Sequence, residues 1–138
     1  MKQSETAAQF VVMAQQAEER GHVAKSARLY KLAGEQAAAA YDNEQARRCF
    51  SQALALTADN ALNERFNLLL ARERLLALLV QTSAQAEDLA DLELLADRLD
   101  DDSSRALVAS RQAAWREATG DLAGAITVAT MATRLAQL

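Results

Sequence analysis

The sequence contains no proline among its 138 residues, and glycine occurs only four times. Both residues are poorly tolerated inside helices, proline because it lacks a backbone N–H donor and glycine because its backbone loses the most freedom on ordering. Alanine, leucine, glutamine, glutamate and arginine dominate instead. These residues lose little free energy on entering a helix, so the composition predicts an all-α protein.

Apolar spacing and capping residues divide the sequence into seven expected helices. Within each one, apolar residues recur at intervals of three and four, which places their side chains on one face. The helices are expected over residues 5–20, 23–41, 42–56, 60–80, 82–99, 102–119 and 121–138. Each boundary carries a tolerance of about two to four residues.

Glycines and short polar residues mark where these helices should begin and end. Gly21 is expected to close the first helix in a left-handed conformation, and Gly120 to end the sixth. A side-chain oxygen at an N-cap accepts a hydrogen bond from the first turn of its helix. The expected N-caps are Asp42 with Gln45, Asp59, Thr82 with Gln85, one of Asp102, Ser103 and Ser104, and Asp121.

Two of the expected helices indicate which side chains face a neighbour. The second carries a continuous stripe made of Val23, Ala27, Tyr30, Ala33, Ala37 and Tyr41. The fifth is expected to turn Leu89, Leu92, Leu95 and Leu99 inward and to keep Glu87, Asp88 and Asp91 in water. The helix over residues 60–80 is apolar around most of its C-terminal part, and we expect it to be the central element.

Small residues recur at fixed spacing between residues 30 and 53. Such residues let two helix backbones approach closely, and one aromatic side chain from each helical hairpin fills the gap where the next hairpin stacks. The pattern consists of Tyr30, Ala33, Gly34, Ala37, Ala46, Phe50 and Ala53. Position by position, it resembles the tetratricopeptide repeat (TPR), a helical hairpin of about 34 residues.

The resemblance extends in part to two further segments. They are residues 21–33, with Gly21, Ser26, Tyr30 and Ala33, and residues 120–132, with Gly120, Ala125 and Ala132 but Ala129 where the family has an aromatic. The resemblance implies a TPR-like α–α superhelix (solenoid) of about seven antiparallel helices. We expect residues 1–138 to form a single TPR-like helical repeat domain, which can be an excerpt of a longer repeat protein.

Two pairings of the helices into hairpins stay open. In the favoured one, a leading helix precedes hairpins two–three, four–five and six–seven, because the tightest turn joins the last two helices. In the other, helix one pairs with helix two and helix seven stands alone.

The residue types that carry chemistry are sparse. His22 lies in a turn with no nucleophile placed beside it, and Cys49 is expected to be an unreactive residue of the inner stripe. A lone cysteine and a lone histidine cannot supply an ordinary metal site. The acidic residues between Glu87 and Asp102 lack the central glycine of an EF-hand loop and are expected to form a solvated face with an N-cap cluster. We therefore predict no catalytic residue, metal or cofactor.

Basic residues on two consecutive helices are the predicted partner-binding residues. Lys25, Arg28 and Lys31 follow one another at intervals of three, and Arg47 and Arg48 add charge on the next helix. In some TPR grooves, basic side chains at such positions clamp a partner's carboxylates, and the resemblance implies the same role here.

The last helix has more apolar surface than a terminal helix should show. Val128, Met131, Leu135 and Leu138 form a stripe beside the alanines that face inward. The outer face of a solenoid's last helix is normally polar, because no further repeat covers it. These four residues therefore predict self-association, most simply a homodimer through the C-terminal helix, unless the chain continues.

The longest apolar run, residues 75–80, is far shorter than the roughly 20 residues of a membrane span, and the N-terminus does not resemble a signal peptide. Residues 81–138 carry five Lys/Arg against ten Asp/Glu, which disfavours nucleic acid. We expect a cytoplasmic protein.

The TPR resemblance implies a non-enzymatic scaffold or adaptor that binds a peptide or helix of a partner protein, as part of a bacterial signalling or regulatory protein. The alternative is a compact helical bundle with a small-molecule-binding or enzymatic pocket among the fourth to sixth helices, near Trp115. Perturbed ionisable groups converging in a closed pocket would favour that alternative.

Overall fold

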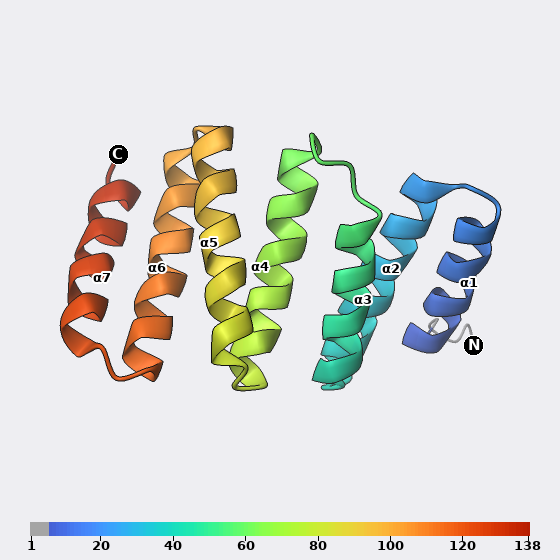
Figure 1. Cartoon of the computed structure of the whole chain (residues 1–138), viewed down its shortest axis with the longest axis horizontal. Helices are drawn as coiled ribbons and strands as arrows, with labels where there is room; N and C mark the ends of the chain where they lie inside the picture. The colour runs from blue at the N-terminus through green and yellow to red at the C-terminus, as the bar shows by residue number, and fades with distance from the viewer. Residues whose placement is uncertain (1–5) are drawn as a thin grey trace. The chain divides into compact units, whose positions relative to one another are not determined.

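A computed structural model describes residues 6–138, and this part of the chain contains seven α-helices and no strand. The all-α prediction is confirmed. The predicted start of the first helix at Glu5 lies outside the described residues. The helices are α1 (Ala7–Glu19), α2 (Val23–Ala39), α3 (Asn43–Ala55), α4 (Leu62–Leu78), α5 (Thr82–Leu99), α6 (Asp102–Ala118) and α7 (Leu122–Ala136) (Figure 1).

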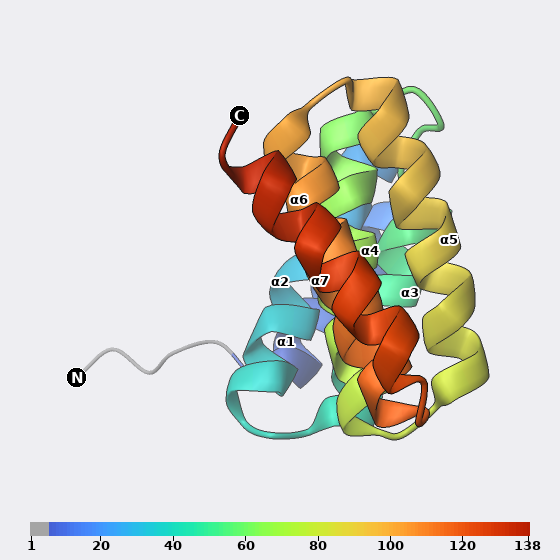
Figure 2. The same cartoon turned by 90° about the vertical axis from the view of Figure 1, so that its left-hand side faces the viewer.

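The chain divides into two compact units, Met1–Leu79 and Val80–Leu138, called here the N-terminal and C-terminal units. In the N-terminal unit α1 packs on α2, α2 on α3 and α3 on α4. In the C-terminal unit α5 packs on α6 and α6 on α7, and Figure 2 shows α7 lying along α6. Within each unit, every helix therefore packs on the one that follows it in sequence.

Most helix connections are tight turns built on one left-handed residue. After α1, Gly21 has φ 77°, its N–H donates to the Glu18 carbonyl, and the His22 N–H donates to the Ala17 carbonyl. Gly120 makes the same turn after α6, as both glycines were predicted to do. Tyr41 takes this position after α2 with φ 60°, so the turn forms there without a glycine. The predicted inward stripe was wrong at both ends: Tyr41 is left-handed, lies outside α2 and is 89% exposed, and Val23, the first residue of α2, is 49% exposed.

The turns set a regular spacing along the chain. From the second helix onward, successive N-caps are 19 or 20 residues apart, at His22, Asp42, Ala61, Gln81, Asp101 and Asp121. A pair of helices with its turns therefore takes up 39 or 40 residues, which is longer than the roughly 34 residues of a TPR hairpin.

Two of the predicted N-caps are confirmed. Asp42 accepts a hydrogen bond from the Gln45 N–H at 3.3 Å, and Asp121 accepts one from the Gly124 N–H at 2.9 Å. A capping box at the start of α1, between Thr6 and Gln9, was not predicted.

The other predicted N-caps are wrong by one or two residues. The turn after α3 continues to Ala61, so Ala61 rather than Asp59 precedes α4. Gln81 is the N-cap of α5, and Thr82 is already helical. Asp101 caps α6, because Asp100 is left-handed and Asp101 is extended, so that Asp102 begins the helix.

The small residues of the TPR-like pattern all lie in the core. Tyr30 and Phe50 are 5% and 4% exposed, and the pattern's other members are buried as well: Ala33, Gly34, Ala37, Ala46 and Ala53. A Cβ placed on Gly34 would lie only 2.9 Å from Cε1 and Cζ of the Phe50 ring. The backbone of α2 thus approaches the Phe50 ring of α3 so closely that any side chain at position 34 would force the ring or the helix to shift.

The inward face of α5 is wider than the leucine stripe alone. Leu89, Leu92 and Leu95 are buried as predicted, but Leu99 is only partly buried. Asp88 was predicted to lie in water and is 3% exposed. That prediction was wrong because Asp88 is three residues after buried Gln85 and four before buried Leu92, on the same face of the helix.

Gly34→Ala is expected to lower the free energy of unfolding by about 1 kcal/mol. Alanine favours a helix interior over glycine by about 1 kcal/mol, whereas forcing a methyl group against a packed ring costs about 1–3 kcal/mol. Urea denaturation followed by circular dichroism measures the difference. In a double-mutant cycle, adding Phe50→Leu should cost less in the Gly34→Ala background than in the wild type. A stabilised Gly34→Ala variant would contradict the close packing.

Candidate functional site

A groove of about 570 Å³ opens in the N-terminal unit between α2 and α4, and we call it the α2–α4 groove. One side comes from α2, the other from the first turns of α4, and the turn after α3 closes one end. The lining residues are Val23, Ala24, Ala27, Arg28, Lys31, Leu56, Thr57, Ala58, Ala61, Glu64, Asn67 and Leu68. Seven of these twelve are apolar, and four of the seven are alanines, so the lining of the groove is largely apolar.

The turn that closes the groove is fixed by hydrogen bonds to the end of α3. Arg65 reaches back from α4, and its Nη1 donates to the carbonyls of Leu54 and Thr57 at 3.3 and 3.2 Å. The Thr57 hydroxyl donates to the Ala53 carbonyl at 2.7 Å. A guanidinium at a helix C-terminus satisfies carbonyls that lack helical partners. Arg65 therefore holds Leu56, Thr57 and Ala58 in place as the end wall.

Opposite charges lie on the two sides of the groove. Arg28 and Lys31 come from α2, three residues apart, and Glu64 comes from α4. Within residues 6–138, Arg28 and Glu64 take part in no ion pair. Lys31 pairs with Glu35 of its own helix, and its Nζ lies 4.0 Å from the Glu35 carboxylate. The charges of the groove are therefore not neutralised across it.

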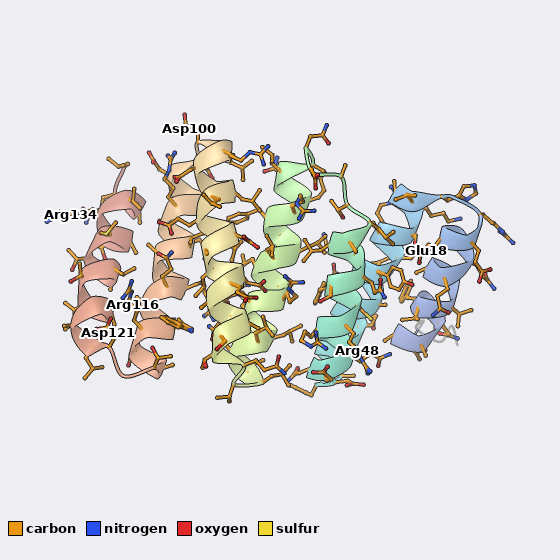
Figure 3. The ribbon with its side chains drawn as sticks, viewed as in Figure 1. Glu18, Arg48, Asp100, Arg116, Asp121 and Arg134 are labelled. Carbon is orange, nitrogen blue, oxygen red and sulfur yellow. The ribbon has the colours of Figure 1, made fainter. Side chains whose placement is uncertain are left out.

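The predicted basic residues are only partly brought together. Arg28 and Lys31 line the groove, whereas Lys25 and Arg48 are exposed outside its lining. Arg48 lies on α3 (Figure 3). Arg47 is bound on its own helix, where its Nε lies 3.2 Å from both carboxylate oxygens of Glu44. This hydrogen bond lowers the pKa of Glu44 and raises that of Arg47.

A second groove, of about 310 Å³, lies in the C-terminal unit beside Trp115. Its polar groups are already engaged. The Trp115 indole N–H donates to the Thr82 carbonyl at 3.0 Å, Gln112 donates to Glu93 at 3.2 Å, and Arg116 pairs with Asp121 at 2.9 Å (Figure 3). It is lined by Ala86, Leu89, Ala90, Glu93, Gln112, Trp115, Arg116, Val128 and Met131.

The predicted self-association stripe on α7 is partly covered. Val128 and Met131 line the second groove, Leu135 is partly buried, and Leu138 is 86% exposed. Met131 is 53% exposed, and two further apolar residues of α7 that were not predicted to take part, Leu122 and Ile126, are 63% and 69% exposed.

Three threonines share the exposed side of α7. The hydroxyls of Thr127, Thr130 and Thr133 each donate to the carbonyl four residues earlier on the same helix, at 3.1, 2.9 and 3.1 Å. Arg134 is the only charged residue between Leu122 and Leu138. The outer surface of this helix is therefore mostly methyl and methylene groups.

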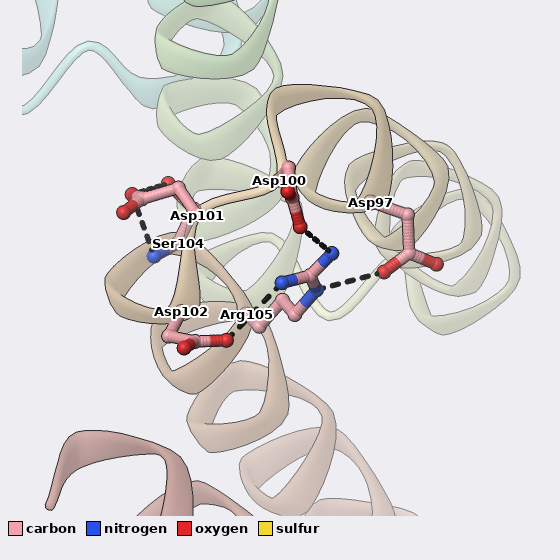
Figure 4. A network of polar contacts seen from close by, with 6 residues as sticks. All are labelled: Asp97, Asp100, Asp101, Asp102, Ser104 and Arg105. Atoms are coloured by element: carbon pink, nitrogen blue, oxygen red, sulfur yellow. Dashed lines mark hydrogen bonds and ion pairs between the residues drawn. The ribbon is translucent and has the colours of Figure 1, made fainter. Parts of the chain in front are cut away.

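The acidic cluster at the turn between α5 and α6 surrounds one arginine (Figure 4). The Arg105 guanidinium lies 3.0, 2.9 and 3.1 Å from carboxylate oxygens of Asp97, Asp100 and Asp102, and these contacts raise its pKa. The sequence hypothesis of a solvated face with an N-cap omitted this central cation. The role of Arg105 at the centre of the cluster depends on how the turn between α5 and α6 folds, and the sequence alone does not show this.

The remaining predictions concern metal and nucleophilic residues. Across residues 6–138, no group of three or more histidine, cysteine, aspartate and glutamate side chains could hold a metal ion. His22 is exposed before α2, and its side chain makes no capping hydrogen bond. Cys49 is buried, which raises the pKa of its thiol. No helix of the described chain has both the length and the apolar character that crossing a membrane requires.

Comparison with protein-family models, with curated proteins and with solved structures found no match to this chain.

Acid is expected to destabilise the chain partly through two N-caps. Hydrogen bonds from Ser104 lower the pKa of Asp101, and those from the Gly124 N–H and Arg116 lower the pKa of Asp121. A carboxyl group with a lower pKa in the folded state stabilises the fold above its unfolded pKa, near 4, and this contribution is lost as the pH falls through the folded pKa.

The variant Asp101→Asn/Asp121→Asn should therefore lose less thermal stability than the wild type between about pH 5 and pH 3, because asparagine caps helices without titrating. Melting curves by circular dichroism measure this. The control Asp59→Asn/Asp91→Asn makes the same change in net charge at exposed positions and should keep the wild-type pH dependence. If the Asp101→Asn/Asp121→Asn variant and the wild type lose the same thermal stability in acid, the two N-cap carboxylates do not contribute to acid destabilisation.

Proposed function

We propose that this chain is a non-enzymatic protein-interaction module, a TPR-like α-solenoid that binds a peptide or helix of a partner protein. The observation that carries the proposal is the α2–α4 groove, whose lining is largely apolar and carries charged side chains that are not paired across it. Apolar surface supplies affinity to a binding site, and a few polar groups at its edge supply orientation.

Two features of the fold support a solenoid. Helices pack on their sequence neighbours within each unit, and their N-caps recur at nearly constant spacing. Stacks of repeats are built in this way, and their grooves bind extended partners. The close packing of α2 on α3 through Gly34 also fits the role that small residues have in TPR hairpins.

The distribution of ionisable groups supports binding over catalysis. Among residues 6–138, the groups with shifted pKa lie outside both grooves: Tyr30, Glu44, Arg47, Cys49, Asp101, Arg105 and Asp121. Active sites typically gather such groups in one cleft. The second groove, beside Trp115, has its charged side chains paired with neighbours, which gives the small-molecule or enzymatic alternative less support.

We also propose that the module works in the cytoplasm, as part of a bacterial signalling or regulatory protein of the kind that the TPR resemblance implies. Its partner is a protein rather than a nucleic acid, because the C-terminal unit carries twice as many acidic as basic residues.

Selection from a displayed peptide library should yield peptides that bind the α2–α4 groove. Ala24→Trp places an indole in the groove from an exposed helix position and should weaken the selected peptides at least tenfold, as measured by fluorescence anisotropy. The control Ala39→Trp lies at an exposed position of α2 outside the groove lining and should bind normally. Failure to enrich any peptide, or equal binding by Ala24→Trp, would refute the proposal.

We also propose that the chain forms a homodimer through α7. Light scattering should then give twice the chain mass for the wild type and a monomer for Leu135→Glu. Because Leu135 is partly buried, Ile126→Glu provides a second variant at a site that is 69% exposed. The control Leu94→Glu changes an equally exposed leucine on α5 and should stay dimeric. A monomeric wild type, or a dimer in both α7 variants, would exclude this interface.

A further inference from the structure

The lining of the α2–α4 groove offers few hydrogen-bond partners to the backbone of an extended peptide. An extended chain needs partners for its backbone N–H and C=O groups, whereas a helix satisfies its own. Most lining side chains are apolar, and the hydroxyl of Thr57 already donates to Ala53. Asn67 is the one carboxamide among the lining residues. A groove of this kind favours a helix that lays its apolar face on the alanines.

The two sides of the groove differ in charge. The α2 side presents the cations of Arg28 and Lys31, and the α4 side presents the carboxylate of Glu64 and the amide of Asn67. Among the described residues no ion pair joins one side to the other, and Arg28 and Glu64 have no ionic partner at all. A ligand that reaches both sides therefore meets opposite charges along its two edges.

The spacing on α2 matches one edge of a helix. Arg28 and Lys31 are three residues apart and lie on the same side of α2. Carboxylates spaced by three or four residues on a partner helix recur at the same interval. Lys25 continues this row just beyond the groove lining and is exposed.

We propose that the partner of this groove is an amphipathic helix with an apolar face, carboxylates along the flank that meets Arg28 and Lys31, and basic or amide side chains along the flank that meets Glu64 and Asn67. This inference rests on the proposed function and adds the chemistry of the partner. Exposed ion pairs are individually weak, so the apolar face supplies the affinity. The charged flanks fix the direction in which the helix lies, because turning it end for end would place like charges together.

A helical peptide library with a fixed leucine and alanine face and randomised flanks tests the inference. On the wild-type protein, selected peptides should carry Asp or Glu on one flank and Lys, Arg or an amide on the other. Circular dichroism of the complex should show the peptide becoming helical. Selected peptides that are blocked by Ala24→Trp but have basic or uncharged residues on both flanks, or that bind in an extended form, would overturn the inference and leave the proposed function standing. A selection that yields no binder would refute both.

Charge reversal gives the second arm. Arg28→Glu/Lys31→Glu should weaken a peptide selected on the wild type about tenfold, and a new selection on this variant should yield peptides with basic flanks. Arg28→Gln/Lys31→Gln should weaken the same peptide less. The control Arg48→Glu changes an exposed cation outside the groove and should leave binding unchanged. Unaltered affinity in the reversed variant, with its helical content intact, would exclude contact of the partner with α2.

Discussion

The close approach of α2 to α3 is the constraint on which the N-terminal unit depends. Gly34 has no side chain, and the Phe50 ring occupies the space where one would be. Ala33 and Ala53 are fully buried, so methyl groups fill the remaining interface between the two helices. Interiors packed at this density transmit any added volume to their surroundings. The packing of α3 on α2 follows from this contact.

The sequence predicted the helices better than the details of the turns between them. Periodicity and composition located all seven helices, because each carries an apolar face long enough to reveal its period. Three N-caps were predicted at the wrong residue. The segments between helices contain several aspartates, serines and threonines, and more than one of them is a suitable N-cap by its residue type. The left-handed turn at Tyr41 carries no glycine and so gave no signal.

The candidate site was less accessible from sequence than the fold. The row of basic residues on α2 was visible as a spacing, and two of its members line the groove. The α4 side of the groove was not visible in the sequence, because Glu64 and Asn67 line the groove only once α4 has packed on α3. Its end wall depends on Arg65, whose hydrogen bonds reach back eight and eleven residues to the end of α3. Contacts of this kind have no local pattern.

The threonines of α7 change what it costs to cover that helix. A surface hydroxyl normally loses its water when a partner buries it, and an unsatisfied hydroxyl is expensive to bury. Those of Thr127, Thr130 and Thr133 already donate within their own helix, so their protons would remain bonded whether the face is wet or dry. Such a surface can be hydrated in the free chain and still be desolvated by another apolar surface without stranding a donor.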